Sequence, residues 1–178
     1  CVYTQPPKKK SRGQKILKTA VHVFSENEGI KVKTNKLSDE NEYTNFIKLN
    51  PDLVVVVAYG QIIPDIYLNN PDLIFLNLHA SLLPKWRGAA PIERAILNKD
   101  KETGISIMKI EKKLDAGPFV KQLKVKINKE TTSGELNMKL SVLGAEALKD
   151  AIELISSNKA NFNQQNEKYA TYAKKINK

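Results

Sequence analysis

The sequence is poor in the residues that build disulfides, metal sites and membrane spans. Among its 178 residues it has one cysteine, which excludes an internal disulfide. Its two histidines, His22 and His79, show no ligand spacing with each other or with that cysteine, so we expect no metal. No apolar run approaches the ~18–20 residues of a membrane helix. These absences favour the cytoplasm and argue against a membrane partner.

Two glycine-based motifs of common enzymes are also missing. The chain has no Gly-x-Gly-x-x-Gly element, so it need not be a nicotinamide-dependent enzyme. Ser81 lacks the Gly-x-Ser-x-Gly setting of a hydrolase, which argues against a serine nucleophile. Any chemistry at this chain therefore needs another arrangement of side chains.

Positive charge is abundant. The chain has 29 Lys and Arg against 19 Asp and Glu, which gives a formal net charge of +10. Such a balance favours contact with polyanions, including nucleic acid. Many lysines stand beside Asn and Ile, as a generally lysine-rich composition would also produce. Charge alone therefore leaves both interpretations open.

The order of apolar segments predicts an α/β fold. Strands that alternate with helices imply a Rossmann-like, mainly parallel sheet with helices on both faces. The best-marked helix begins at Thr132 or Ser133, and the apolar spacing predicts which of its residues are buried. Those residues are Leu136, Leu140, Leu143, Ala147, Ala151 and Ile155. The expected elements are strands at 30–33, 53–58, 73–77, 104–110 and 119–127 and helices at 15–28, 38–49, 91–97 and 132–156.

Two details of the first part of the chain follow from the same patterns. Residues 6–15 are rich in lysine and proline and predict a loop. The helix at 15–28 has an apolar stripe that should be buried, with His22 lying off it. The stripe consists of Ile16, Leu17, Ala20, Val21 and Phe24.

A polar cluster follows the apolar strand at 73–77. Asn77 and His79 are two residues apart, so in a strand their side chains point to the same side. Ligands of open α/β sheets bind just beyond strand ends. Histidine moves protons near neutral pH, an amide stabilises a developing oxyanion, and a carboxylate such as Asp115 favours protonated histidine. Together these residues fit acyl transfer without a covalent nucleophile.

The same residues also have ordinary structural explanations. Asn77 at a strand end can simply close a turn, and Asp115 before Ala116 and Gly117 is a common turn former. Residue types alone leave the catalytic and the structural interpretations open.

Longer motifs favour the catalytic interpretation, because they resemble those of a known family. Asn77-Leu78-His79, followed by Ser81-Leu82-Leu83-Pro84 and then by Asp115-Ala116-Gly117, resembles the signature of the formyltransferase family. The stretch 86–92, Trp-Arg-Gly-Ala-Ala-Pro-Ile, is similar to the branch that acts on methionyl-tRNA. Stretches at 4–6, 55–60 and 169–173 agree, so the resemblance covers nearly the whole chain in order.

The resemblance implies an enzyme of translation initiation. It would transfer a formyl group from the co-substrate 10-formyltetrahydrofolate to the amino group of methionyl-initiator tRNA, with no metal. By the same resemblance Asn77, His79 and Asp115 are the catalytic trio: the first two stabilise the oxyanion, and Asp115 tunes His79 and assists proton transfer. We expect a monomer in a bacterial-type cytoplasm, an organelle being the alternative.

The resemblance also implies two binding regions. Backbone groups would form hydrogen bonds with the folate ring, and apolar side chains would pack against it. The expected folate-binding residues are Ser81, Leu82, Leu83, Pro84, Tyr59, Gly60, Ile62 and Ile63. Basic residues of the first loop would contact tRNA phosphate, namely Lys8, Lys9, Lys10, Arg12 and Lys15, with a solvated loop as the alternative. Arg87 either meets tRNA or braces its loop by bonding carbonyls.

Family members have an additional strand–helix unit before the position of Cys1 and a small β-barrel after the catalytic domain. We therefore expect residues 1–157 to be a catalytic domain without its first strand–helix unit. Residues 158–178 would be a polar tail leading to the barrel, with Tyr169 and Tyr172 as anchors. Such a chain should keep the site residues but be less stable and weaker on tRNA, and it could be inactive alone.

Two competing functions stay open. One is formyl transfer to an amino sugar or a purine precursor, against which the stretch 86–92 and the basic loop argue. The other is a folate- or RNA-binding module without activity, against which the intact trio argues.

Overall fold

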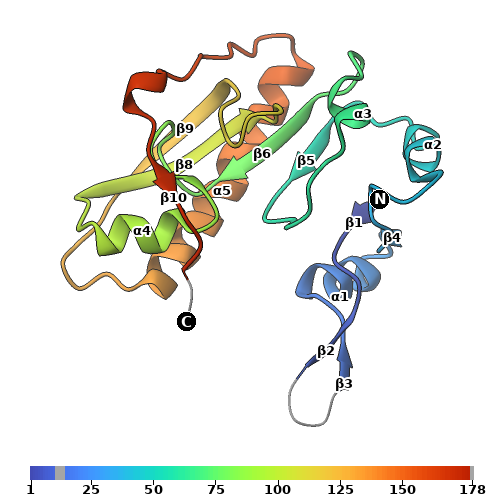
Figure 1. Cartoon of the computed structure of the whole chain (residues 1–178), viewed down its shortest axis with the longest axis horizontal. Coiled ribbons are helices and arrows are strands. Elements are labelled where there is room, and N and C mark those ends of the chain that lie inside the picture. Colours follow the sequence, from blue (N-terminus) through green and yellow to red (C-terminus); the bar gives the residue numbers. More distant parts are fainter. Residues whose placement is uncertain (11–14, 177–178) are drawn as a thin grey trace. The chain divides into compact units, whose positions relative to one another are not determined.

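The computed structural model describes residues 1–10 and 15–176, and Figure 1 shows the elements in chain order. Arg12 lies outside the described residues. The chain forms two compact units, one made of Cys1–Pro51 with Ala58–Asn70 and one made of Asp52–Val57 with Pro71–Lys178. Each unit is described by itself below.

The described residues of the first unit form two small sheets and three helices. Strand β1 (Val2–Tyr3) pairs in parallel with β4 (Val32–Lys33). Strand β2 (Lys8–Lys10) pairs antiparallel with β3 (Lys15–Leu17). The helices are α1 (Ala20–Asn27), α2 (Glu42–Ile47) and α3 (Asp65–Leu68).

Aromatic rings connect the elements of this unit. The ring of Phe46 in α2 lies 5.9 Å from that of Tyr3 in β1 and 5.1 Å from that of Tyr67 in α3. The Tyr67 hydroxyl donates to the carbonyl of Leu37 at 2.9 Å. Buried Glu42 accepts hydrogen bonds from the Tyr3 hydroxyl and the Lys33 ammonium. Although burial raises the pKa of Glu42, these two bonds lower it overall, so the carboxyl is held as an anion.

The predicted loop and helix at the start of the chain are wrong in detail. Residues 15–17 pair with β2 as a hairpin, and the helix begins after Thr19, whose hydroxyl accepts from the His22 backbone N–H. The predicted apolar stripe is the exposed side of the helix: Val21 is 52% and Phe24 63% exposed. His22 and Ser25 face inward instead, because the packing of α1 on β4 overrides the pattern.

The second unit contains a four-stranded sheet in the order β5-β6-β8-β9. Only β5–β6 is parallel; the β6–β8 and β8–β9 pairs are antiparallel. The expectation of a mainly parallel sheet is therefore wrong. The short connection between β8 and β9 accounts for one antiparallel pair, and β8 also runs antiparallel to β6 although β7 and α4 lie between them in the chain. The strands are β5 (Val54–Val56), β6 (Phe75–His79), β8 (Glu102–Lys109) and β9 (Phe119–Lys126).

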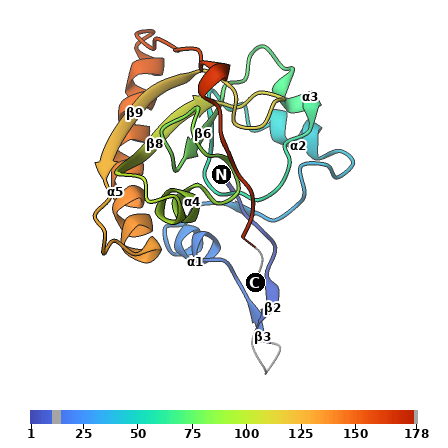
Figure 2. The ribbon, with the colours of Figure 1, turned by 60° about the vertical axis from the view of Figure 1, so that its left-hand side comes forward.

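Helix α5 (Ser133–Ser156) covers one face of this sheet, as Figures 1 and 2 show. Its predicted start is confirmed: Thr132 and Glu135 form a reciprocal capping box. Gly144 brings α5 close to β6, since a Cβ there would lie 2.6 Å from Leu78 Cδ1. The core on this face comprises Leu76, Ile92, Ile105, Ile107, Val125, Leu136, Leu140, Ala147 and Ala151.

Helix α4 (Pro91–Leu97), also predicted, contributes Ile92 to the same core. Both α4 and α5 therefore pack on one face of the sheet, where helices on both faces were expected. In Figure 2 the C-terminal segment with β10 (Tyr172–Ala173) lies on the other side of β8 from α5. Among the described residues, no helix is both long and apolar enough to cross a membrane.

The segment 158–176 packs within the second unit rather than leaving it as a linker. Phe119 of β9 forms a bridge with Asn163, and β10 pairs in parallel with β7 (Arg87–Gly88). Buried Ala173 and Gln165 are its contact points, whereas Tyr169, predicted as an anchor, is 61% exposed. The segment therefore belongs to the structure that carries the polar strand end.

Candidate active site

The polar strand end is the end of β6. Side chains alternate along a strand, so Leu76 and Leu78 face the apolar core while Asn77 and His79 face the opposite side. In the neighbouring strand β8, Ser106 stands beside His79. Within residues 1–10 and 15–176 the Asn77 side chain forms no hydrogen bond, so its two N–H groups are available to a ligand.

Both ring nitrogens of His79 have neighbours. Nε2 lies 2.9 Å from the Trp86 carbonyl oxygen, and Nδ1 lies 3.6 Å from Asp115 Oδ2. A carbonyl oxygen only accepts, so Nε2 carries the proton of this bond. The distance at Nδ1 is longer than a hydrogen bond but short enough for charge attraction. The hydrogen bond at Nε2 therefore fixes the orientation of the ring, and Nδ1 is the ring nitrogen that could exchange a proton or a hydrogen bond with a ligand.

Asp115 is held in place by backbone geometry. Its φ is 46°, in the left-handed region that a non-glycine residue adopts infrequently. Its Oδ2 accepts a hydrogen bond of 2.8 Å from the Gly88 backbone N–H. Such backbone conformations collect at functional sites. This one directs the carboxylate toward His79.

The loop that fixes His79 is itself bound by the C-terminal segment. Trp86 has a φ of 60°, and its backbone N–H donates to the Thr171 hydroxyl at 2.9 Å. The Arg87 N–H donates to the Thr171 carbonyl. Gly88 has a φ of 114°, and a Cβ there would lie 2.9 Å from the Ala173 carbonyl oxygen. Only glycine allows β7 to approach β10 this closely in that conformation.

Arg87 is fully buried under this loop. Its guanidinium donates to Gln165 Oε1 and to both Glu167 oxygens. The hydrogen bonds to Glu167 raise the pKa of Arg87, and those from Arg87 and Lys113 lower the pKa of Glu167 to about 2. Of the two roles expected for Arg87, bracing fits this position and tRNA contact does not, because no part of the side chain reaches the surface. Its partners are side chains rather than the carbonyls expected.

Gln165 connects this brace to Asp115. Its amide Nε2 donates to the carbonyls of Asp115 and Gly117, at 2.9 and 2.7 Å. One side chain thus bonds the buried guanidinium through oxygen and the turn that carries Asp115 through nitrogen. The carboxylate beside His79 therefore depends on a residue far along the chain.

Backbone groups in the segment after His79 form hydrogen bonds with other residues of the protein. The Ser106 hydroxyl accepts from the Leu83 N–H and donates to the Ser81 carbonyl. Gln122 donates to the Leu83 carbonyl and to the Ser106 hydroxyl. Backbone groups that were expected to pair with a folate ring thus have protein partners. Leu82 and Pro84, which are half-buried, are the predicted residues of this segment with accessible apolar surface.

The other predicted folate residues lie in the first unit. In that loop the Tyr59 carbonyl accepts from Gln5 Nε2 at 2.8 Å, and Gly60 has a φ of 71°. Burial, with the charges of Glu42 and Asp39, raises the pKa of Tyr59. Ile62 is 91% exposed and Ile63 is buried.

The predicted tRNA lysines form part of a hairpin. Lys8, Lys9 and Lys10 make up β2, and Lys15 begins β3, opposite Lys10 in the register. Lys8, Lys9 and Lys15 are exposed. A solvated surface and a phosphate contact are both compatible with these positions.

Sequence reasoning missed the residues that hold the site. Ser106 and Gln122 lie on the face of β8 and β9 that points away from α5, and Gln165, Glu167 and Thr171 lie in the segment expected to be a tail. A polar residue among apolar neighbours in β8 was the one available signal, at Ser106. Among the described residues, no group of three or more His, Cys, Asp or Glu is placed to hold a metal.

On this α/β scaffold an amide and an imidazole lie on the same face at the end of β6, and a carboxylate from the turn between β8 and β9 lies beside the imidazole. The sequence pattern described as "Formyl transferase" matches residues 1–152. The chain belongs to the formyltransferase family.

Individual relatives carry the comparison further. The chain is 49% identical to the methionyl-tRNA formyltransferase of Pelagibacter ubique over 99% of its own length, and 48% identical to that of Dictyoglomus thermophilum. It spans 58% and 57% of the length of these two curated relatives.

Solved structures share the fold. A phosphoribosylglycinamide formyltransferase from Anaplasma phagocytophilum matches with a TM-score of 0.72 and 22% identity, over 82% of this chain and 74% of that one. A sugar N-formyltransferase from a Shewanella species matches with a TM-score of 0.70 and 24% identity, over 86% and 58%. At such identities the likeness concerns the α/β formyltransferase fold.

Proposed function

We propose that this protein transfers a formyl group from 10-formyltetrahydrofolate to the amino group of methionyl-initiator tRNA. One observation carries the chemistry: His79, fixed at Nε2 by the Trp86 carbonyl, has Asp115 at Nδ1 and Asn77 on the same face of β6. The 49% identity to a methionyl-tRNA formyltransferase supports the acceptor. The proposal includes a monomer acting in a bacterial-type cytoplasm.

In the first step the neutral amino group of methionine attacks the formyl carbon. A C–N bond forms, and the carbonyl electron pair moves onto oxygen. The Asn77 amide donates an N–H to this oxyanion, and protonated His79 donates its Nδ1–H, since Nε2–H is already bound to Trp86. Asp115, 3.6 Å from Nδ1, stabilises the positive ring.

The second step moves protons and breaks the donor bond. Asp115 Oδ2 is engaged by the Gly88 N–H, so Oδ1 accepts the proton of the attacking amine, directly or through water. The intermediate then collapses, and the bond between the formyl carbon and N10 breaks. N10 takes up the proton, which leaves tetrahydrofolate and formylmethionyl-tRNA.

The remaining predicted residues would bind the two substrates, the folate and the tRNA. Leu82 and Pro84 would contact the folate with their apolar surface. For the loop 59–63 of the first unit, a folate contact stays a prediction from the resemblance. The exposed lysines of the β2–β3 hairpin would attract tRNA phosphate in a salt-dependent way.

The test is formyl transfer with a labelled donor and three acceptors: methionyl-initiator tRNA, an amino sugar nucleotide and glycinamide ribonucleotide. Transfer to the tRNA alone is expected. Transfer to either small acceptor would replace the proposed substrate. Transfer to none of the three, with folate binding intact, would leave a binding module and overturn the proposal.

A further inference from the structure

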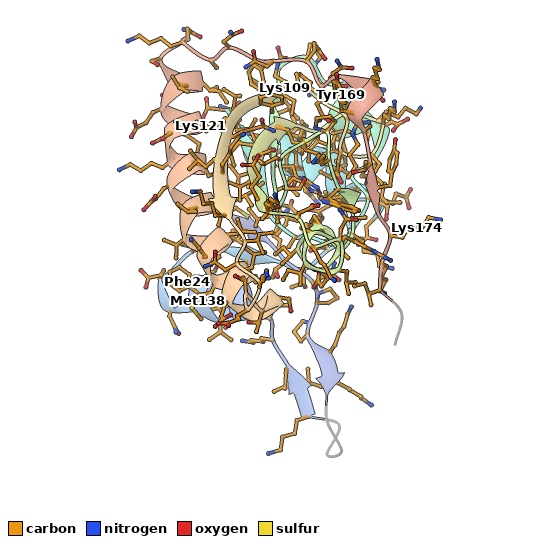
Figure 3. All side chains as sticks on the ribbon, turned by 90° about the vertical axis from the view of Figure 1, so that its left-hand side faces the viewer. Phe24, Lys109, Lys121, Met138, Tyr169 and Lys174 are labelled. Atoms are coloured by element: carbon orange, nitrogen blue, oxygen red, sulfur yellow. The ribbon has the colours of Figure 1, made fainter. Side chains whose placement is uncertain are left out.

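A row of polar side chains crosses the sheet of the second unit on the face that points away from α5. His79 of β6 is opposite Ser106 of β8 in the register, and Ser106 is opposite Gln122 of β9. Lys121, the neighbour of Gln122, is paired with Asp150 of α5 at 3.0 Å, and Figure 3 shows it on the α5 side of β9. Because side chains alternate along a strand, Gln122 shares the face of His79.

The Ser106 hydroxyl uses all of its hydrogen-bonding capacity within the protein. It is fully buried, accepts from the Leu83 N–H at 3.1 Å and from Gln122 Nε2 at 2.8 Å, and donates to the Ser81 carbonyl at 2.7 Å. A hydroxyl has one proton and two lone pairs, so these three bonds leave nothing for a ligand. Since a backbone N–H only donates and a carbonyl only accepts, the direction of each bond is determined.

The same bonds determine the orientation of the Gln122 amide. Its Nε2 donates to the Leu83 carbonyl at 2.9 Å and to the Ser106 hydroxyl. Both partners accept, so the nitrogen of the amide has to face them. The amide oxygen forms no hydrogen bond within residues 1–10 and 15–176. Gln122 therefore contributes two N–H donors, and these donors are what its replacement would remove.

These bonds fix the position of Leu82. The residue before it is held through its carbonyl, and the residue after it is held through both its N–H and its carbonyl. The Leu82 side chain lies against β8, since a Cβ at Gly104 would come within 2.7 Å of Leu82 Cδ2. Leu82 is half-buried, so the remainder of its apolar surface is open to a ligand. Two polar side chains of the sheet therefore determine where that surface lies.

We propose that Ser106 and Gln122 are positioning residues for the formyl donor, which rests on the folate-dependent activity proposed above. They touch neither the donor nor the reacting atoms, and they act through the loop whose Leu82 and Pro84 contact the folate. An interaction that holds the donor equally in the ground state and the transition state changes KM and leaves kcat. Loss of either residue should therefore raise the KM of the donor with little change in kcat. The KM of methionyl-tRNA should stay constant, because its proposed contacts lie in the β2–β3 hairpin.

Calorimetric titration of the full chain with 5-formyltetrahydrofolate tests donor binding apart from turnover. Ser106→Ala leaves buried groups of the loop without a partner and should weaken binding of this probe roughly tenfold. Ser106→Thr keeps the hydroxyl and should restore binding. Initial rates with 10-formyltetrahydrofolate and methionyl-tRNA then give kcat and both KM values for the same variants.

Three substitutions of the half-exposed Gln122 separate its donors from its oxygen. Gln122→Lys keeps N–H donors and loses the oxygen, so it should bind the probe as the unaltered protein does. Gln122→Glu keeps an oxygen and has no N–H, and Gln122→Met has neither, so both should weaken binding. Recovery with Gln122→Glu but not with Gln122→Lys would assign the oxygen to direct donor contact and overturn the positioning role.

Matched controls come from the same two strands. Thr103→Val removes a buried hydroxyl of β8 that has no hydrogen-bond partner among the described residues, and Lys124→Met removes a side chain of β9 that bonds Glu102 rather than the loop. Neither should change probe binding.

Two results for Ser106→Ala would contradict the inference: an unchanged affinity for the probe, or an equal rise in the KM of methionyl-tRNA. Probe binding that responds to the variants as expected, without formyl transfer to any acceptor, would instead overturn the proposed function and leave the positioning of the folate site standing.

Discussion

The two faces of β6 are held in different ways. On one face Leu76 and Leu78 pack on α5, with Gly144 allowing the close approach. On the other, His79 is fixed by hydrogen bonds that run through Trp86 to Thr171. Dispersion and apolar burial act on the first face without direction, whereas each bond on the second depends on orientation.

This difference separates stability from activity. Packing on the apolar face depends on the volume of the side chains, so other apolar side chains of similar size would be tolerated there. The polar face needs particular atoms at particular angles, and one lost partner leaves a buried polar group unsatisfied. We therefore expect substitutions on the first face to change the free energy of unfolding, and substitutions on the second to change turnover first.

The largest effect is expected on the apolar face. Leu140→Ala removes a buried side chain of α5 and should lower the free energy of unfolding by ~2–5 kcal/mol. Turnover of the molecules that remain folded should be unchanged. Urea unfolding and kcat of the same preparation measure both. Met138→Ala, on the exposed side of the same helix, is the control and should change neither.

The next effect is expected at the polar strand end. His79→Ala should lower kcat/KM by ~10²–10³-fold, the range for a lost oxyanion donor. It should change the melting temperature little. Steady-state formyl transfer measures the first effect and calorimetry the second. His22→Ala, at the other histidine of the chain, is the control and should leave kcat/KM unchanged. An equal loss of kcat/KM in this variant would contradict a role for His79 as the oxyanion donor.

A smaller effect is expected at the brace. Gln165→Leu leaves the Arg87 guanidinium and the carbonyls of Asp115 and Gly117 without their amide partner. Stability should fall by ~1–3 kcal/mol, and kcat should fall as well because Asp115 loses its support. Urea unfolding and initial rates measure these. Gln164→Leu, at an exposed neighbour, is the control. Lost stability with unchanged kcat would separate the brace from the site.

The smallest effect is expected from acid. Arg87 and Lys113 lower the pKa of Glu167 from 4.5 to about 2, so its stabilising contribution is complete above pH 4.5 and is lost as the pH falls toward 2. The unaltered protein should therefore lose more stability across that window than Glu167→Gln does. Melting temperatures from pH 5 to pH 2 test this. Parallel curves would contradict it, and Glu146→Gln should follow the unaltered protein.

The apolar face could be predicted from the sequence, and the polar face only in part. The spacing in 132–156 and the alternation in 119–127 are local patterns, and both elements are confirmed. The parallel sheet was wrong because strand direction depends on connections that periodicity does not describe. The first helix was placed too early because the pairing of 15–17 with β2 outweighs helical spacing.

At the site, the resemblance supplied Asn77, His79 and Asp115, but not what holds them. Arg87 and Gln165 are 78 positions apart, and no pattern in a polar segment indicates such a pairing. Thr171 acts through its backbone as well as its hydroxyl, and a backbone contact has no signature in residue type. These contacts arise from the tertiary fold alone.

The pairing of β10 with β7 gives the site an order of assembly during synthesis. A growing chain has made β6, β8, β9 and α5, and with them the buried cluster between the sheet and α5, before Gln165, Thr171 and Ala173 leave the ribosome. Its sheet can therefore close while the Trp86 loop still lacks its partners. A product stopped shortly after α5 would keep that cluster and bury its leucines, yet leave the loop that fixes the His79 ring without its partners.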